Sequence, residues 1–385
     1  MSSHPAVVVV AYNRPHSLTR LLNSLSLADY EEGYPDLIIS VDFSDDFTDE
    51  VGQIAEAFNW NGQKEVIIQP KNLGLKKHVL RCGDLTKRYD SIIMLEDDLI
   101  VSPKFYRFAV ETLSLVQNSQ EVSQVALYQA TFNEAAMVPF EALKSSSDFF
   151  LMQVPCSWGQ IWTNNQWESF KNWYLENESD FKYNTLPKGI REWSDKSWKK
   201  PYFIYLKETH KYVLYPYVSY SMNINEEGTN VSQKDFIYSN SLALGLVDRP
   251  LVLRTDVPKY DEAFMIDSDY LYRKLSSHEL QRVQIDFFGS KLHMMADEDL
   301  VLTLLPAKNT LISFGLDLKP IELNVICRIE GEEIKLVKKK DIVSNRLTSD
   351  VMAYLYPIPK WYYPYFQEPL KDRIIKTFQF LIKKN

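Results

Sequence analysis

The segment AVVVVAYNRP, from Ala6 to Pro15, decides the fold of this chain. Its first six residues form an uninterrupted run of valine and alanine, which is typical of a strand buried on both faces of a sheet. A helix should follow at once, because Pro15 suits a first helical turn and leucines recur with helical spacing at positions 18, 21, 22 and 25. A buried strand that leads into a helix begins a parallel β-α-β unit.

The alternation of strand and helix patterns continues through the first 150 residues. Buried strands are predicted at Leu37–Val41, Glu65–Gln69, Ser91–Glu96, Gln124–Gln129 and Phe149–Val154. Helical periodicity lies between most of these strands, over residues 51–58, from 75 to 88 and over 103–116. We therefore expect an α/β fold with a mostly parallel sheet and flanking helices.

The composition is that of a globular protein and excludes some classes. Of 385 residues, 45% are hydrophobic and 13% aromatic, so the chain has enough apolar side chains for a packed core. The formal net charge is −8, and a nucleic-acid binder would need a basic face that this average does not offer. We expect no nucleic-acid partner.

The chain divides into three predicted parts. Residues 1–255 hold the α/β domain, and residues 256–345 form a small β-rich module with short alternating runs at 301–305, 321–329 and 333–337. Residues 346–385 form an aromatic and basic tail that contains one amphipathic helix. Residues 366–385 include five basic and two acidic residues, so this helix could be an interfacial membrane anchor. The alternative is a helix docked on the core or on a second copy of the chain.

The sequence carries no signal-peptide pattern and no apolar run long enough for a membrane span. Its three cysteines are far apart and fit neither a disulfide framework nor a zinc site. We expect a cytoplasmic protein, with the inner face of the membrane as its other place of action.

Polar side chains follow the predicted parallel strands, where ligands of open α/β sheets bind. They are Arg14 after the first strand, Asp42 after the second, residues 76–81 after the third, and the triplet Glu96–Asp98 after the fourth. None of these places has the glycine-rich turn of a dinucleotide-binding or P-loop protein.

The acidic triplet predicts a divalent cation. Three consecutive carboxylates repel one another unless a cation compensates them, and Mg²⁺ or Mn²⁺ is commonly held by one or two carboxylates plus phosphate oxygens. The alternative is a solvated acidic turn that caps the helix beginning near Pro103.

Arg14 and Asp42 each allow two interpretations. Arg14 lies at a helix N-terminus, which favours a bound anion, and its other role would be a surface ion pair. Asp42 could accept hydrogen bonds from a nucleoside, or it could be the N-cap of the helix near Asp49.

Together, VVVVAYNRP, IISVDFS, NLG and MLEDDL resemble the glycosyltransferases of the GT-A fold. EDDL and the pairing of Arg14 with Asp42 look most like the N-acetylglucosaminyltransferase I family and its bacterial relatives. The likeness runs from Ala6 to about Ser232 and leaves out the C-terminal module. It implies a Mn²⁺ or Mg²⁺ cofactor and a UDP-sugar donor, with UDP-GlcNAc as the donor of the closest family.

The resemblance also implies roles for residues of the first half. Asp98 resembles the direct metal ligand, Asp97 the ribose contact, and Glu96 a catalytic-site neighbour of the sugar. Asp42 matches the uracil contact. Arg14 lies on the uracil and phosphate side.

A further nucleotide contact is Arg81 or His78, and His78 could equally be structural. The segment VPCSWGQIWTNNQW resembles a loop that closes over the donor and helps form the acceptor site, with Trp158, Gly159 and Trp162 as its marked residues. Clustered tryptophans also occur simply as core.

REWSDKSW resembles the segment that carries the catalytic base, with Asp195 at the matching position. Glu192 is its rival, and Asp195 could instead only cap the following turn. A base of this kind deprotonates the acceptor hydroxyl.

The resemblance implies a metal-dependent transfer of a sugar from a UDP-sugar to a hydroxyl of a glycan or lipid-linked saccharide, in bacterial surface polysaccharide synthesis. The expectation of inversion rests on the resemblance alone. Two alternatives remain. A sugar nucleotidyltransferase would need a glycine-rich loop after the first strand, and AYNRPHS supplies none. A non-catalytic carbohydrate-binding protein would use the aromatic middle region alone.

Overall fold

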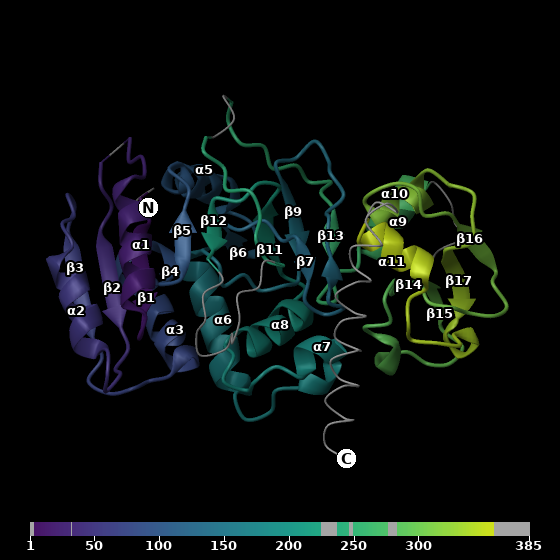
Figure 1. Ribbon diagram of the computed structural model, residues 1–385, viewed down its shortest axis with the longest axis horizontal. Coiled ribbons are helices and arrows are strands. Elements are labelled where there is room, and N and C mark those ends of the chain that lie inside the picture. Colours follow the sequence, from purple (N-terminus) through teal and green to yellow (C-terminus); the bar gives the residue numbers. More distant parts are fainter. Residues whose placement is uncertain (1–3, 32, 225–236, 246–248, 276–282, 358–385) are drawn as a thin grey trace, which may run out of the picture.

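The computed structural model describes residues 4–31, 33–224, 237–245, 249–275 and 283–357. Within these residues a nine-stranded sheet with helices on both faces forms the larger part, and a four-stranded sheet forms a smaller module at one end (Figure 1). The order of the large sheet is β13-β9-β11-β6-β10-β4-β1-β2-β3.

The strands of the large sheet are β1 (Ala6–Ala11), β2 (Leu37–Val41), β3 (Lys64–Ile68), β4 (Ser91–Glu96), β6 (Val122–Ala126), β9 (Phe149–Met152), β10 (Gln160–Thr163), β11 (Tyr212–Pro216) and β13 (Lys259–Tyr260). Two short pairs lie outside it, β5 (Leu99–Val101) with β12 (Ser221–Asn223), and β7 (Phe132–Asn133) with β8 (Val138–Pro139). The helices of this part are α1 (Pro15–Ser26), α2 (Thr48–Ala57), α3 (Leu75–Gly83), α4 (Thr86–Tyr89), α5 (Phe105–Val116), α6 (Asn164–Asn177), α7 (Lys188–Arg191) and α8 (Lys199–Glu208).

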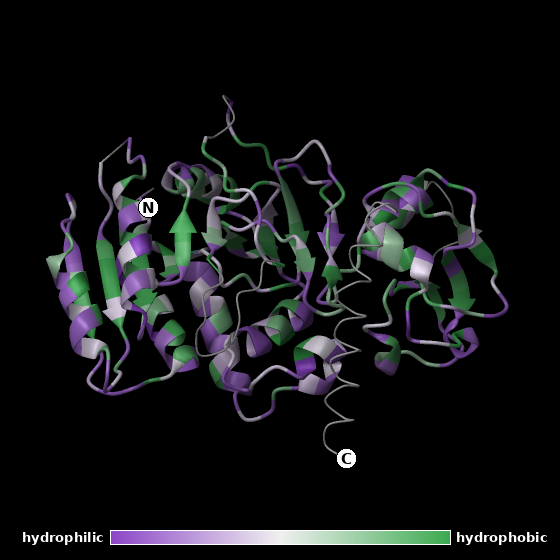
Figure 2. Ribbon diagram, viewed as in Figure 1, coloured by the Kyte–Doolittle hydropathy of each residue, from purple (hydrophilic) through white to green (hydrophobic). Residues whose placement is uncertain are grey.

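The sheet is mostly parallel. β1 pairs in parallel with β2 and β4, and β2 pairs in parallel with β3, while β10 runs antiparallel between β4 and β6. Alternate residues of β1 enter two different cores: Val7 and Val9 pack on the side of α1, α2 and α5, whereas Val8 and Val10 pack on the side of α3, α6 and α8. Figure 2 shows these central strands as hydrophobic and the exposed parts of the helices as hydrophilic.

Most of the predicted first half is confirmed. The strands predicted at Ala6–Ala11, Leu37–Val41 and Ser91–Glu96 occur with the predicted bounds. These strands are buried from end to end except at Glu96, as expected for strands covered on both faces of a sheet.

The smaller module contains β14 (Gln284–Ile285), β15 (Leu300–Thr303), β16 (Ile312–Phe314) and β17 (Ile334–Lys338), with α9 (Ser268–Leu275), α10 (Ile321–Ile326) and α11 (Ser349–Leu355). The strand predicted within 321–329 is wrong, because α10 occupies this segment. The buried Asn324 explains the helix: its side-chain oxygen accepts the backbone N–H groups of Asp317 and Leu318, and its amide group donates to the carbonyl groups of Leu318 and Ile321.

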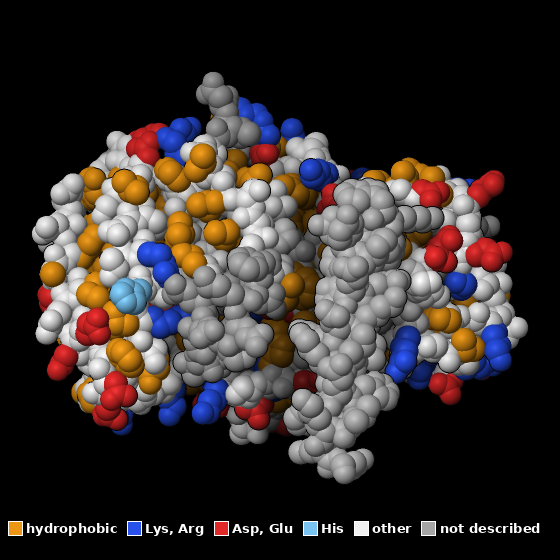
Figure 3. All heavy atoms as spheres, viewed as in Figure 1, with side chains coloured by type: hydrophobic (Ala, Val, Ile, Leu, Met, Phe, Trp, Pro, Cys, Tyr) orange, Lys and Arg blue, Asp and Glu red, His pale blue; other side chains and the backbone are white. Residues whose placement is uncertain are grey.

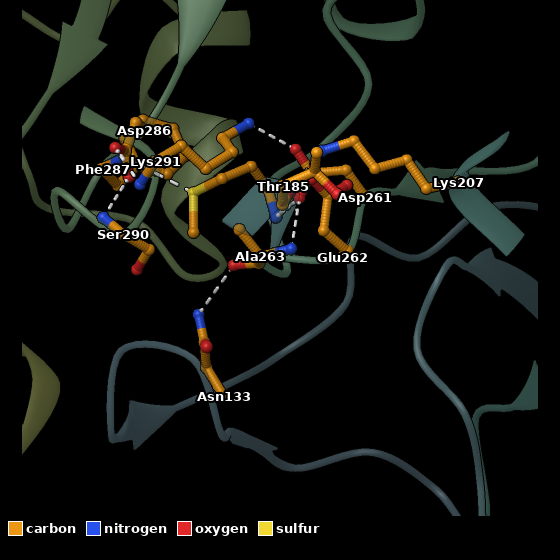
Figure 4. Close-up of polar contacts among 11 residues, drawn as sticks. Asn133, Thr185, Lys207, Asp261, Glu262, Ala263, Asp286, Phe287, Ser290 and Lys291 are labelled. Atoms are coloured by element: carbon orange, nitrogen blue, oxygen red, sulfur yellow. Dashed lines mark hydrogen bonds and ion pairs between the residues drawn. The ribbon is translucent and has the colours of Figure 1, made fainter. Parts of the chain in front are cut away.

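A polar junction joins the module to the large sheet (Figure 4). Lys291 of the module forms an ion pair with Asp261, and Lys207 of α8 forms one with Glu262. The backbone carbonyl of the next residue, Ala263, accepts a hydrogen bond of 3.2 Å from the amide of Asn133. The turn at 261–263 therefore contacts the module, α8 and β7 together.

The surface shows no separation of charge on the face seen in Figure 3, where acidic and basic side chains are interspersed over the described part of the chain. Among the described residues, none of the helices combines the length and the apolar character that crossing a bilayer requires. The predicted amphipathic helix after residue 364 lies outside the described residues.

Candidate active site

The candidate site lies at the carboxyl edge of the parallel strands. β1, β2, β3 and β4 all end at this edge, and the antiparallel β10 begins there, with Gln160 opposite Met94 of β4. The turn at Trp158 and Gly159 directly precedes β10 and so lies at the same edge as Glu96. The sheet thus brings the acidic triplet, Arg14 and Trp158 to one side of the molecule.

Arg14 holds the acidic triplet together. Its guanidinium forms an ion pair with Asp97, and its Nη1 lies 2.8 Å from Oδ2 of Asp98. The other oxygen of Asp97 accepts the backbone N–H of Tyr12 at 3.1 Å. Of the two interpretations of Arg14, the ion pair is present, but it is a half-buried pair inside the site and not one on the open surface.

Burial and mutual repulsion perturb the acids of the triplet. Burial, and next to it the charge of Asp98, raises the pKa of Glu96 to about 8. Burial also raises the pKa of Asp97 to about 6, although Arg14 acts in the opposite direction. Burial lowers the pKa of Arg14, but the carboxylates of Asp97 and Asp98 outweigh it and raise that pKa above its usual value.

The triplet has unused acceptors that fit a cation. Within the described residues, Oδ1 of Asp98 and Oε1 of Glu96 are buried and have no hydrogen-bond partner. The same residues contain no group of three His, Cys, Asp or Glu side chains placed to hold a metal ion. A Mg²⁺ or Mn²⁺ site that uses one carboxylate together with phosphate oxygens does not need such a group, and Asp98 is the residue here that could supply that carboxylate.

Asp42 organises the nucleotide side of the edge. Its carboxylate is buried and accepts three backbone N–H groups, from Phe43 at 3.0 Å, Leu73 at 2.8 Å and Gly74 at 3.0 Å. The N-cap alternative is wrong, because Phe47 occupies the N-cap of α2. Asp42 instead ties the end of β2 to the turn that leads into α3, and its contact with uracil remains a prediction.

His78 and Arg81 take different positions on α3. His78 is buried and its Nε2 lies 2.7 Å from the hydroxyl of Ser40 in β2, so its place is structural. Burial lowers the pKa of His78 to about 4, which keeps the ring neutral. Arg81 lies in the last turn of α3 with an exposed side chain. For both residues, a contact with the nucleotide stays a prediction.

The tryptophan segment is split between the site and the core. Trp158 is half-buried at the sheet edge, whereas Trp162 is fully buried in β10, packs against Trp167 and Tyr202, and offers no surface to a ligand in this conformation. Gly159 has φ +87°, and a Cβ there would lie 2.8 Å from the hydroxyl oxygen of Ser221. This turn therefore requires glycine.

Asp195 lies on an exposed loop that a buried lysine holds. The Asp195 side chain is 81% exposed, and its Oδ1 accepts a hydrogen bond of 2.8 Å from Lys200. Lys200 also donates to the backbone carbonyls of Arg191 and Trp193. The bond from Lys200 lowers the pKa of Asp195, so this carboxylate is ionised at neutral pH. The rival Glu192 is exposed as well.

Two charged residues of the site have no motif in the sequence. Lys199, the first residue of α8, forms an ion pair with Glu134, and its ammonium lies over the rings of Trp158 and Trp193. Glu134 and Lys199 are 65 residues apart in the sequence. Only the aromatic pattern around residues 158 and 193 could have drawn attention to this region, because neither charged residue has a distinctive spacing.

Comparison with known families identifies the first domain. Residues 6–151 match the family described as glycosyl transferase family 2, a range that runs from β1 into β9 and includes Arg14, Asp42 and the triplet. This part of the chain is therefore similar to the domains of that family, within a mixed α/β fold of the GT-A type. The match does not extend to the finer resemblance to the N-acetylglucosaminyltransferase I family.

Solved structures show only a distant likeness. Staphylococcus aureus TarS residues 1–349 shares 14% identity at a TM-score of 0.37, covering 56% of this chain and 59% of that one. The complex of the same fragment with UDP-GlcNAc has 14% identity and a TM-score of 0.37 and covers 62% of both chains. GalNAc-T7 with UDP, GalNAc and Mn²⁺ has 12% identity and a TM-score of 0.38, covering 55% of this chain and 42% of that one.

The chain thus spans less than two thirds of the structures it matches, and likenesses of this size carry no inference about its function. No curated protein matches the chain.

Proposed function

We propose that this protein is a glycosyltransferase. It moves a sugar from a UDP-sugar, with UDP-GlcNAc as the first donor to test, to a hydroxyl group of a glycan or lipid-linked saccharide, with inversion and with the help of Mn²⁺ or Mg²⁺. The observation that carries the proposal is the Arg14–Asp97–Asp98 cluster at the carboxyl end of β4, inside the segment that matches glycosyl transferase family 2.

The cluster suits a diphosphate that departs with negative charge. In this proposal Asp98 holds the cation through the oxygen that has no partner among the described residues, and Arg14 lies beside it as a second positive group. A divalent cation bound there would supply positive charge toward the leaving diphosphate. Asp97 has both oxygens engaged, so its role is to orient Arg14 and Tyr12, and contact with the ribose would require one of these bonds to open.

The acceptor hydroxyl needs a base on the other side of the sugar. Asp195 is the proposed base. Its lowered pKa keeps it ionised, and Lys200 fixes the loop that carries it. The charge of Lys76, near the start of α3, also lowers the pKa of Asp195.

Calorimetry with UDP and Mn²⁺ tests the proposed function. The full chain should bind UDP in the presence of Mn²⁺ and should lose most of that binding when the metal is removed. Asp98→Ala should reduce the Mn²⁺-dependent binding at least tenfold, whereas Asp45→Ala, an exposed acid in the loop after β2, should leave it unchanged. The proposal fails if UDP gives no binding heat with either metal, or if Asp98→Ala binds as the natural chain does.

The place of action belongs to the same proposal. We propose that the protein works in the cytoplasm or at the inner face of the membrane, in bacterial surface polysaccharide synthesis, with its basic tail as the contact with the lipid. The sequence pattern of residues 366–385 is the support for this contact. Flotation with anionic liposomes should recover the full chain and leave a chain ending at Lys360 in the soluble fraction; equal recovery would remove the membrane contact.

A further inference from the structure

A buried ion pair next to the acidic triplet has no part in the proposed transfer. Nζ of Lys199 lies 3.1 Å from Oε2 and 3.4 Å from Oε1 of Glu134, and the two side chains are only 12% and 13% exposed. A buried pair of this kind is weak support for stability, because removing both charges from water opposes their attraction. Its presence at the sheet edge suggests a function in ligand binding.

Aromatic rings surround the pair on two sides. The ammonium of Lys199 lies 5.7 Å from the ring centre of Trp158 and 4.8 Å from that of Trp193. The crevice that Glu134, Trp158 and Lys199 help to line has a volume of about 20 Å³. That is room for one water molecule, so the crevice can take a single hydroxyl group but not a whole sugar ring.

The pair also lies near the sugar end of the site. The ammonium of Lys199 lies over the ring of Trp158, which ties the pair to the turn before β10. Trp158 lies just before β10, whose first residue pairs with Met94, two residues before Glu96. The crevice therefore lies at the same edge of the sheet as Glu96, the carboxylate that the sequence predicts near the transferred sugar.

We propose that the Glu134–Lys199 pair binds a hydroxyl group of the transferred sugar and thereby contributes to donor specificity, an inference that rests on the proposed function. An ammonium donates and a carboxylate accepts, and a hydroxyl group can satisfy both at once. A phosphate would fit Lys199 but not the adjacent Glu134, because two anions repel each other.

The test replaces both charges by groups of similar shape, in the double variant Lys199→Met, Glu134→Gln. Removing both members leaves no unpaired buried charge, so the fold should keep its melting temperature. Calorimetry with Mn²⁺ then compares UDP with UDP-GlcNAc. UDP should bind within about twofold of the natural chain, and UDP-GlcNAc should bind about 10- to 100-fold more weakly, which is the range for a lost hydrogen bond to a charged group.

A second double variant is the matched control. Lys171→Met, Asp84→Asn removes another lysine–carboxylate pair. Asp84 lies at the C-terminal end of α3, whereas the turn at Gly74 lies at its N-terminal end. This control should change the affinity for neither ligand. A Glu134 and Lys199 variant that keeps the natural ratio of the two affinities overturns the hydroxyl contact, and so does equal weakening of both ligands, which would indicate a phosphate contact. If the natural chain binds neither ligand, the proposed function itself fails, and this inference fails with it.

Discussion

Asp42→Asn is the substitution whose effect on stability can be worked out most fully from the structure. The buried carboxylate of Asp42 accepts backbone N–H groups from Phe43 and Leu73 on Oδ1 and from Gly74 on Oδ2. Asparagine has nearly the same shape but carries an NH₂ group in place of one oxygen. If its oxygen keeps the two partners of Oδ1, its NH₂ group faces the N–H of Gly74, and two donors then oppose each other.

The magnitude follows from these three bonds. A hydrogen bond to a charged group contributes about 1.5–3 kcal/mol and a neutral one about 0.5–1.5 kcal/mol. The variant loses the bond from Gly74 and weakens the bonds from Phe43 and Leu73, while the lower desolvation cost of a neutral side chain returns part of this loss. We expect the free energy of unfolding to fall by about 2–4 kcal/mol, and the melting temperature by at least about 4 °C.

Thermal unfolding of the full chain at neutral pH measures this effect, with urea unfolding as a second measurement. Asp45→Asn is the control, because Asp45 is an exposed acid three residues further along. It should change the melting temperature by less than about 1 °C. A melting temperature of Asp42→Asn within about 1 °C of the natural chain would show that the three backbone bonds do not anchor the turn before α3.

Three further predictions concern other parts of the site. Gly159→Ala should lower the free energy of unfolding by about 1–3 kcal/mol, measured by urea unfolding, because alanine disfavours φ +87° and its Cβ has no room. Lys200→Met should raise the pKa of Asp195 toward its ordinary value, measured by carboxyl NMR titration, whereas Lys196→Met should not. Burial raises the pKa of Glu96 to about 8, so the folded chain binds the proton of the Glu96 carboxyl group more tightly than the unfolded chain does. This tighter binding stabilises the fold at low pH, and the stabilisation is lost as the pH rises from about 4.5 to 8. Glu96→Gln should flatten that decline, measured by urea unfolding at about pH 5 and about pH 8.

Each of these three predictions can be contradicted by a specific result. Gly245→Ala is the glycine control, because a Cβ there would meet no atom within 4 Å, and equal stability of the two alanine variants would contradict the strain at Gly159. An unchanged titration of Asp195 in Lys200→Met would show that solvent alone sets its pKa. An equally steep decline in Glu96→Gln would assign the pH dependence to other acids.

Local patterns predicted the strands of the first half because those strands are buried on both faces. The apolar runs at Ala6–Ala11 and Ser91–Glu96 are short and alternate with helical patterns, as in a parallel sheet, and the structure has both strands with the predicted bounds. The segment at 321–329 was different, because a short apolar run fits a strand and a helix equally well. Its outcome depends on the buried Asn324, whose partners cannot be read from the run itself.

Residues of the candidate site could be proposed from the sequence where a charged side chain directly follows a predicted strand. Arg14 and the triplet were proposed in this way, and the structure brings Arg14 into contact with Asp97 and Asp98. The partners of Asp42 were not predictable, because Leu73 and Gly74 reach it only through the pairing of β2 with β3. Lys199 and Glu134 were missed for the same reason, since only the packed loops bring them together.

The central claim, that this edge of the sheet binds and activates a nucleotide sugar, is tested most directly by a screen of nucleotide-sugar hydrolysis with Mn²⁺, run on the full chain without an acceptor. We predict slow, metal-dependent release of UDP from a UDP-sugar, and at least a tenfold lower rate in Asp98→Ala. Release from no nucleotide sugar, or release at the same rate in Asp98→Ala, would contradict the claim.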